Sequence, residues 1–320
     1  MVRRTALVVA ALTTVTILAG CGSVASSEDA PTRDTPAPAT PSTSSAPVPS
    51  TSPAPATSVS SSVPTPMPTV SPPVHTRPAR PTPELGTVPP PWLGKRVLPR
   101  TADGFGEIRP TPPALRDRRF TLPDRLPMLP GNGFASRVVS PAPQQVLDRS
   151  TWAPGCPVGK ADLAWVQLAF WGFDGHRHTG ELLVNKSAAE GLVQVFGDLY
   201  RRHFPIEEMR ITRKDEQTAP PTGDGNDTGA FNCRPVRGAT SYSQHAYGLA
   251  VDVNPFQNPY TKGDVVLPEL ASAYLDRDRR APGIIHADGP VVQAFARIGW
   301  GWGGSWHSLK DFQHFSANGT

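Results

Sequence analysis

Apolar residues are unevenly distributed along the chain, and their pattern divides it into four stretches. Residues 6–18 form a short apolar run, residues 21–113 carry few large apolar side chains, and residues 114–151 place apolar residues among prolines. Residues 152–320 show the periodicities of strands and helices. The last stretch is therefore predicted to be the folded domain, and the third an extended arm that packs against it.

The first elements of this domain are predicted to form a β-hairpin. Residues 165–173 are aromatic and aliphatic enough for a strand, and Asp174-Gly175 is a turn signal. Residues 180–184 then return as a second strand. Shorter strands are expected at 209–212 and at 249–253.

Two helices are expected among these strands. Ser187-Ala188-Ala189-Glu190 has the form of a capping box, which predicts a helix that runs to about His203 and stops before Pro205. A shorter helix is predicted over residues 290–298. Paired strands with helices between them indicate an α+β domain on a mostly antiparallel sheet with flanking helices.

The N-terminal apolar run has the features of an export signal. Arg3-Arg4 precede it, and it is too short to span a bilayer. Leu18-Ala19-Gly20-Cys21 resembles the lipobox of bacterial lipoproteins, which implies a signal peptide over residues 1–20 and a lipid on Cys21. Ordinary signal cleavage beside an incidental cysteine is the alternative. We therefore expect an exported protein, lipid-anchored to the outer face of the bacterial cell membrane and facing the cell wall.

Residues 21–113 are dominated by Pro, Ser, Thr and Ala. This composition cannot bury enough apolar surface to offset its ordering entropy, so it predicts a long disordered tether. The formal net charge of +4 favours anionic wall polymers at a bacterial surface. Export, more than charge, excludes nucleic acid as a partner, and we expect a monomer.

The chain has three cysteines, of which Cys21 is assigned to the lipid. Cys156 and Cys233 remain as a pair in an oxidising compartment, which predicts a disulfide between them. Two buried free thiols are the alternative. A metal-binding role is disfavoured because the pair lacks a Cys-x-x-Cys spacing.

The strand predicted at 249–253 contains a carboxylate within an apolar run. Burying Asp252 unpaired would be costly, so a cation is expected beside it. His245 lies seven residues earlier, and an imidazole with a carboxylate is a common pair of Zn²⁺ ligands. A third ligand is available in the Trp-rich segment 302–315. Three protein ligands that leave a fourth position open are typical of a catalytic zinc site.

Two motifs in this region resemble a known family. Ser-x-His-x-x-Gly-x-Ala-x-Asp covers residues 243–252, and Asp-x-x-His-Phe covers residues 311–315, after a Trp-Gly-Gly-x-Trp segment. Together they resemble the VanY-type D-alanyl-D-alanine carboxypeptidases, zinc peptidases whose family also includes peptidoglycan L-alanyl-D-glutamate peptidases. The resemblance extends over residues 152–316, which are taken as the core of the catalytic domain 152–320.

The resemblance implies a role for the polar residues of both motifs. One zinc ion per chain, on the face of the sheet, would be held by His245, Asp252 and His314. The carboxylate of Asp311 would take a proton from the attacking water and return it to the leaving amine. His307 competes with His314 for the third ligand position but matches the motif less well.

A peptide that ends in D-alanyl-D-alanine carries a free carboxylate, so a cation is expected near the site. Arg234 is predicted to bind it, because a similar Phe-Asn-x-Arg precedes the first motif in family members. Arg237 and Arg213 are alternatives. Ser243 is expected to bind substrate or to orient His245.

The remaining conspicuous side chains have less specific interpretations. His176 and His178 flank the hairpin turn and are interpreted as turn or rim residues. Trp302 and Trp306 are candidates for a cleft wall, although aromatic core is the commoner fate of such residues. Ser305 stands where the family usually has an aspartate, so that acidic side chain has no counterpart here.

The function predicted from these features is a lipid-anchored zinc peptidase that acts on peptidoglycan stem peptides as a D-alanyl-D-alanine carboxypeptidase. An endopeptidase of the L-alanyl-D-glutamate type and a non-catalytic wall-binding lipoprotein are the alternatives. The carboxylate of Asp311 argues against a binding module, which needs no general base. The absence of His-Glu-x-x-His and of Ser-x-x-Lys excludes thermolysin-like zinc peptidases and penicillin-binding serine enzymes.

Overall fold

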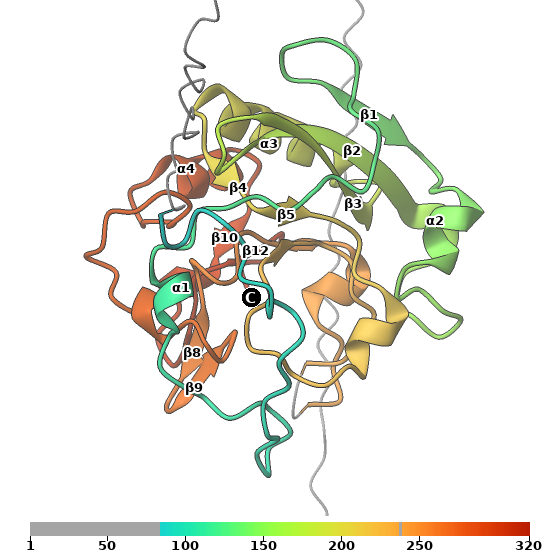
Figure 1. Ribbon diagram of the computed structural model, residues 1–320. Coiled ribbons are helices and arrows are strands. Elements are labelled where there is room, and N and C mark those ends of the chain that lie inside the picture. The colour runs from blue at the N-terminus through green and yellow to red at the C-terminus, as the bar shows by residue number, and fades with distance from the viewer. Residues whose placement is uncertain (1–83, 237–238) are drawn as a thin grey trace, which may run out of the picture. The chain divides into compact units, whose positions relative to one another are not determined.

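The computed structural model describes residues 84–236 and 239–320 (Figure 1). They belong to the second of two compact units, Thr76–Thr320. The predicted signal peptide 1–20, the lipid site at Cys21 and the alternative cation Arg237 lie outside the described residues. Within the described ranges, no helix combines the length and the apolarity that crossing a bilayer requires.

The largest sheet is built around the predicted hairpin, which the structure confirms. β2 (Leu163–Gly172) and β3 (Arg177–Asn185) pair antiparallel, and β1 (Ser136–Val139) pairs antiparallel with the other edge of β2. β4 (Pro205–Ile206) pairs parallel with the end of β2. The turn between β2 and β3 needs a left-handed residue, and Gly175 provides it with a φ of +74°.

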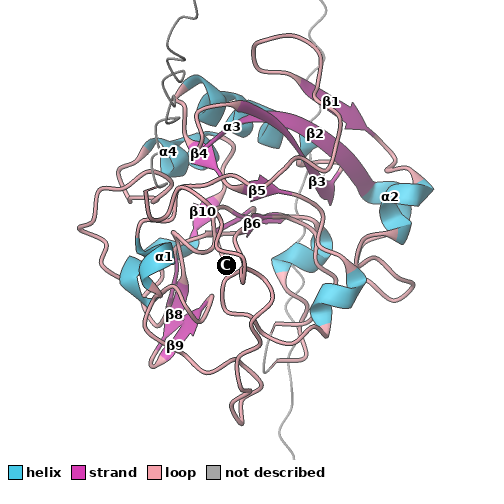
Figure 2. Cartoon of the chain, viewed as in Figure 1, coloured by secondary structure: helices cyan, strands magenta, loops and turns pink. Residues whose placement is uncertain are grey.

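A long helix packs on this sheet. α3 (Ala189–Arg201) contacts β2, and α4 (Pro290–Arg297) lies beside α3 (Figure 2). The buried face of α3 carries apolar side chains at the spacing of one helical stripe. These side chains are Leu192, Val195, Phe196 and Leu199.

The capping box predicted for the start of α3 is not formed. The N-cap is Ala188, which makes no side-chain cap bond. The Ser187 hydroxyl donates instead to Oδ1 of Asn185, the last residue of β3, at 2.8 Å. The Ser187 hydroxyl is therefore bonded to Asn185 and does not cap the helix as the motif predicted.

The other strands of the described residues form three small sheets, ordered β10–β12–β7, β11–β8–β9 and β5–β6. All their pairings are antiparallel except β5–β6. The strands are β5 (Glu208–Met209), β6 (Asp227–Thr228), β7 (Ala250–Asp252), β8 (Tyr260–Lys262), β9 (Val265–Leu267), β10 (Gly301–Trp302), β11 (Lys310–Asp311) and β12 (His314–Ser316). β7 lies within the strand expected at 249–253, whereas β5 shares only Met209 with the strand expected at 209–212.

Short helices connect these sheets. They are α1 (Pro113–Arg116), α2 (Gln144–Asp148) and the 3₁₀ helices η1 (Lys160–Asp162), η2 (Lys214–Gln217), η3 (Gln244–Tyr247), η4 (Ser272–Tyr274) and η5 (Gly303–Ser305). Few helices with mostly antiparallel sheets make the domain α+β, as the sequence predicted.

The main core anchors the two strands that carry candidate ligands. Val251 of β7 and Phe315 of β12 are fully buried in the cluster that also contains the apolar faces of α3 and α4. The ring of Phe295 from α4 stacks on Phe315 with their centroids 3.9 Å apart. The adjacent residues Asp252 and His314 are therefore held on rigid backbone.

The prediction of a disordered linker through residue 113 is wrong over residues 84–113. Leu98 is buried in a second core cluster with Leu115 and Phe120. Backbone bonds also fasten this segment, such as the one from Leu98 N to Pro221 O at 2.8 Å. Proline-rich composition hid these contacts, because a few well-spaced apolar residues are enough to fill a satellite core.

The predicted arm, residues 114–151, also contributes regular structure and buried charge. It contains α1, β1 and α2. Arg118 is fully buried and makes two bonds, of 2.7 and 2.6 Å, to the carboxylate of Glu207. A buried ion pair of this kind joins the arm to the domain, since neither charge is tolerated alone.

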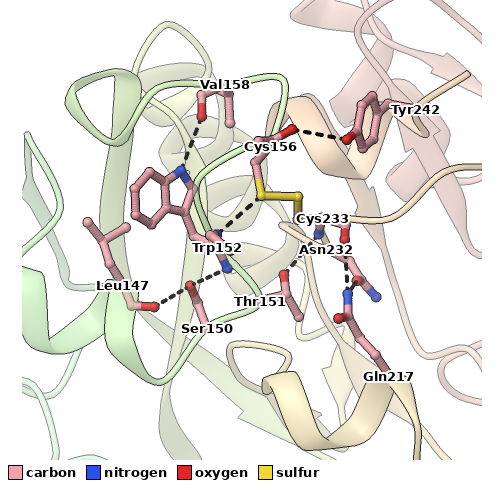
Figure 3. Close-up of a disulfide and its surroundings, with 12 residues drawn as sticks. Leu147, Ser150, Thr151, Trp152, Cys156, Val158, Gln217, Asn232, Cys233 and Tyr242 are labelled. Atoms are coloured by element: carbon pink, nitrogen blue, oxygen red, sulfur yellow. Dashed lines mark hydrogen bonds between the residues drawn. A yellow bond between two sulfur atoms is a disulfide. The ribbon is translucent and has the colours of Figure 1, made fainter.

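The structure joins Cys156 and Cys233 in the predicted disulfide, with Cα atoms 5.8 Å apart (Figure 3). Cys233 N donates to the Thr151 hydroxyl at 2.9 Å. Nearby, the Tyr242 hydroxyl donates to the carbonyl of Gly155 at 3.0 Å. Together these contacts fix the segment that leads into η3.

Candidate metal centre

His245 lies in η3, in a turn that sequence features explain. Ser243 is the N-cap, and its hydroxyl accepts from His245 N at 3.4 Å. The turn ends at Gly248 with a φ of +69°, and a Cβ there would lie 2.4 Å from Asn185 N. Only glycine combines this conformation with so close an approach. The chain then enters β7 at Ala250.

Strand pairing brings the other two candidate ligands together. In the antiparallel pair β7–β12, Asp252 lies directly opposite His314. Side chains of opposed residues project to the same face of the sheet, with short separations between them. The register of the two strands therefore places a carboxylate and an imidazole side by side, although 62 positions separate them in the sequence.

The three side chains converge on one point. His314 Nδ1 is 3.1 Å from Asp252 Oδ1, and His245 Nε2 is 3.3 Å from the same oxygen. The two imidazole nitrogens are 3.1 Å apart. Zinc-to-ligand distances of about 2.0–2.1 Å correspond to about 3.3 Å between neighbouring ligand atoms of a tetrahedron. The spacing fits a single small metal ion.

The hydrogen bonds behind the imidazoles determine which nitrogen faces the cluster with a lone pair. His245 Nδ1 lies 2.6 Å from the carbonyl oxygen of Ala230, which can only accept, so Nδ1 carries the hydrogen. His314 Nε2 lies 3.4 Å from the carbonyl oxygen of Thr320 and donates to it in the same way. Two imidazole lone pairs and a carboxylate oxygen thus face one another, an arrangement that requires a cation.

The pKa values of Asp252 and His314 also show that the cluster favours positive charge. Burial alone would raise the pKa of Asp252, but His245 and His314 beside it hold that pKa below its usual value. Burial disfavours the charged form of His314, yet the hydrogen bond to Asp252 raises its pKa overall. Both shifts favour positive charge between the two imidazoles and the carboxylate, which is what a bound metal ion would supply.

Asp311 lies beside this cluster and has a buried oxygen with no hydrogen-bond partner, Oδ1. Burial, followed by the negative charge of Asp252, raises the pKa of Asp311 to about 6. A carboxylate with such a pKa can take up and release a proton near neutral pH. It is therefore suited to proton transfer rather than to a structural ion pair.

A cleft of about 790 Å³ opens onto the cluster and Asp311. Ser243 and Arg234 also line it, so the two residues predicted to meet substrate lie at the site. Arg234 is exposed, and its guanidinium donates to the carbonyl of the next residue, Pro235, at 3.3 Å.

The alternative cation and ligand lie elsewhere. Arg213 lines a different cavity and pairs with Asp215 at 3.0 Å. His307 is exposed and does not line the cleft. The hydroxyl of Ser305 donates to the carbonyl of Trp302 at 2.7 Å, and Ser305 does not line the cleft.

The conspicuous aromatic and histidine residues have different positions. Trp306 lines the cleft, with its ring 5.4 Å from that of His314, whereas Trp302 is buried in the main core. His178 bonds Asp124 at 2.8 Å, far from the cleft lining, and His176 is exposed at the hairpin turn.

Sequence reasoning missed several residues of the cleft. Phe105 comes from the segment expected to be linker, and Tyr260 and Leu267 come from the β8–β9 hairpin. The turn signal Gly263-Asp264, between residues typical of strands, could have predicted the hairpin. Nothing local to Phe105 indicates that it reaches a site more than a hundred residues away in the sequence.

Comparisons with known proteins bear on this segment directly. Residues 237–317 match a family model described as D-alanyl-D-alanine carboxypeptidase. The match covers less than half of the chain but includes His245, Asp252, Asp311 and His314. It confirms the family resemblance of the two motifs, and the His-Asp-His cluster within the matched segment suits a metal ion. No curated protein and no solved structure matches the chain.

Proposed function

We propose, starting from the match of residues 237–317 to D-alanyl-D-alanine carboxypeptidases, that this protein is a zinc peptidase that removes the terminal D-alanine from peptidoglycan stem peptides. The observation that carries the proposal is the convergence of two imidazole lone pairs and the Asp252 carboxylate within 3.3 Å, beside Asp311, whose buried Oδ1 has no hydrogen-bond partner. A zinc ion there would stabilise negative charge that develops on the substrate carbonyl.

The chain's own residues divide the remaining work. Asp311 takes the proton of the attacking water and delivers it to the leaving amine. Arg234, at the cleft, binds the terminal carboxylate of the substrate. Ser243 holds the start of η3 through its bond to His245 N and so orients the imidazole.

Two other functions are compatible with parts of this site. An endopeptidase that cuts the L-alanyl-D-glutamate bond would use the same cluster, but it would not need Arg234 for a terminal carboxylate. A non-catalytic wall-binding lipoprotein would not need a carboxylate oxygen that is buried without a hydrogen-bond partner beside the cluster. The unpartnered oxygen of Asp311 therefore favours catalysis.

The test is an incubation of the purified full-length protein with defined stem peptides, followed by mass spectrometry of the products. A carboxypeptidase releases free D-alanine from pentapeptides, loses that activity with a chelator and regains it with one equivalent of Zn²⁺. Cleavage between L-alanine and D-glutamate would establish the endopeptidase instead. Binding without any cleavage would establish the wall-binding module.

We further propose that the protein is exported as a monomer and anchored by a lipid on Cys21, with the cell wall as its substrate and no nucleic acid partner. The lipobox-like sequence before Cys21 supports the anchor. Cys21→Ser should release the protein from the membrane fraction or leave it unprocessed. Unchanged membrane retention of that variant would count against lipidation.

A further inference from the structure

One wall of the cleft comes from outside the family-matched segment. Phe105 lines the cleft, and its loop is fastened to the domain on both sides. Before it, Leu98 N donates to Pro221 O at 2.8 Å, and after it Arg109 N donates to Glu269 O at 3.3 Å. The family domain and the preceding segment therefore share the cleft.

The loop that carries Phe105 is held tightly. Thr101 N donates to the carbonyl of Phe105 at 2.8 Å and closes the loop. The next residue, Gly106, is buried and donates to Glu269 Oε1 at 2.7 Å. A Cβ on Gly106 would meet that oxygen at 2.8 Å, so the backbone approaches as closely as glycine allows. These bonds fix the backbone of the loop at Phe105.

Strand order aligns this wall with the proposed catalytic carboxylate. Asp311 of β11 lies opposite Tyr260 of β8, and Tyr260 lies opposite Leu267 of β9. Opposed residues of antiparallel strands share a face, so these three side chains form one row, and all of them line the cleft. Glu269, two residues after Leu267, accepts from Gly106 N and so ties the Phe105 loop to the chain just beyond β9, the strand of this sheet that does not neighbour β11.

The length of the row exceeds a terminal dipeptide. Adjacent strands lie about 4.8 Å apart, so Leu267 stands about 10 Å from Asp311. An extended peptide rises about 3.3 Å per residue, so one residue on each side of the scissile bond covers about 7 Å in all. The substrate atoms near Phe105 therefore belong to the part of the peptide that precedes the terminal dipeptide.

We propose that Phe105 is a specificity-determining residue that packs against a long alkyl side chain on the residue preceding the terminal dipeptide. The proposal rests on the proposed function. The cleft is lined by the metal cluster and Arg234, which are polar, and also by Phe105 and Leu267, whose side chains are apolar. An apolar wall of this kind favours contact with methylene groups, because burying them against an aromatic ring removes apolar surface from water.

The test compares two peptides that differ only in this side chain. They are acetylated peptides ending in D-alanyl-D-alanine, preceded in one by Nε-acetyl-lysine and in the other by glycine. The native full-length protein should prefer the lysyl peptide in kcat/KM. Phe105→Ala should reduce that preference about tenfold, mainly through KM, and Phe105→Leu should recover part of it.

A matched control is Val97→Ala, which shortens an apolar side chain that is 60% exposed and does not line the cleft. It should leave the preference as in the native protein. An unchanged preference in Phe105→Ala, or an equal loss on both peptides, overturns the proposal. If the native protein cleaves neither peptide, the proposed function fails. The role of Phe105 is then tested by calorimetry, which measures how tightly native protein and Phe105→Ala bind the lysyl peptide. Weaker binding of the lysyl peptide to Phe105→Ala supports the wall, and equal binding overturns it.

Discussion

The four polar residues at the centre of the cleft have two different roles, metal binding and proton transfer. His245, Asp252 and His314 direct their lone pairs at one point, whereas Asp311 stands beside that point with an unpartnered oxygen. Removing a ligand should therefore affect metal affinity first, and removing Asp311 should affect proton transfer alone. The two effects can be separated because metal content and turnover are measured independently.

We expect His314→Ala, and likewise His245→Ala and Asp252→Ala, to lose bound zinc together with activity, because two protein ligands hold the ion poorly. Asp311→Ala should keep about one zinc per chain while turnover falls about 10²–10⁴-fold, the usual contribution of a positioned acid–base group. Metal analysis and a D-alanine release assay on the four variants check this.

Asp311→Glu is the matched control, because it keeps the carboxylate and shifts it by one methylene. It should recover part of the rate lost in Asp311→Ala. Near-native turnover of Asp311→Ala, or loss of its zinc to the same extent as in His314→Ala, would contradict the role given to this residue.

At this scale the sequence predicted the metal cluster well and the surrounding polar contacts poorly. Asp252 and His314 were identifiable because each belongs to a motif within its own segment. The pairing of β7 with β12 then places the two residues opposite each other. The Ala230 carbonyl behind His245 was not identifiable, since any residue carries a carbonyl. The partner of Ser187 was missed for a similar reason, because Asn185 competes with the helix terminus.

At the scale of elements, the β2–β3 hairpin is joined to the arm by a histidine between two carboxylates. His178 Nδ1 is 2.8 Å from Asp124, and its Nε2 is 3.1 Å from Asp174. Burial disfavours the imidazolium, but the hydrogen bonds to Asp124 and Asp174 raise the pKa of His178 above 6.5 overall. Stability from this contact is therefore fully present below pH 6.5 and is lost as the pH rises through the folded-state pKa.

His178→Gln should accordingly lower the free energy of unfolding by about 2 kcal/mol near pH 6, the contribution of a hydrogen bond to a charged group, and by much less at pH 9. Urea denaturation of native and variant protein at both pH values measures the difference. The exposed neighbour His176 provides the control, since His176→Gln should change stability little at either pH. An equal loss at pH 6 and pH 9 would show that the charge on His178 is irrelevant.

At the scale of the whole molecule, the folded part of the chain begins well before Trp152, where sequence patterning placed the domain. Regular alternation marks strands that are buried on one face, and the segment 84–151 contributes to the core mainly through isolated residues such as Leu98 and Leu115. Composition therefore classified part of it as linker. The burial of Arg118 is unpredictable from sequence, because its partner Glu207 lies 89 positions away.

A chain that lacks residues 1–83 should unfold cooperatively with the same urea midpoint as the full chain. A chain that lacks residues 1–151 should fail to fold. The longer deletion removes β1 and Arg118 and leaves Glu207 buried without its cation, which costs about 3–5 kcal/mol by itself. Circular dichroism during urea titration compares the two deletions. If the chain that lacks residues 1–151 unfolded cooperatively with a native urea midpoint, the structural role of residues 84–151 would be refuted.

The carbonyl of Ala230 that fixes the tautomer of His245 gives the site an unusual mutational profile. A side-chain acceptor can be deleted by one codon change, whereas a main-chain carbonyl survives every substitution at its own position. The orientation of the imidazole is thus encoded by the path of the backbone between β6 and η3, and it is insensitive to the residue at 230 as long as that path is kept. Substitutions at position 230 should therefore be tolerated, whereas substitutions of the three candidate metal ligands should not.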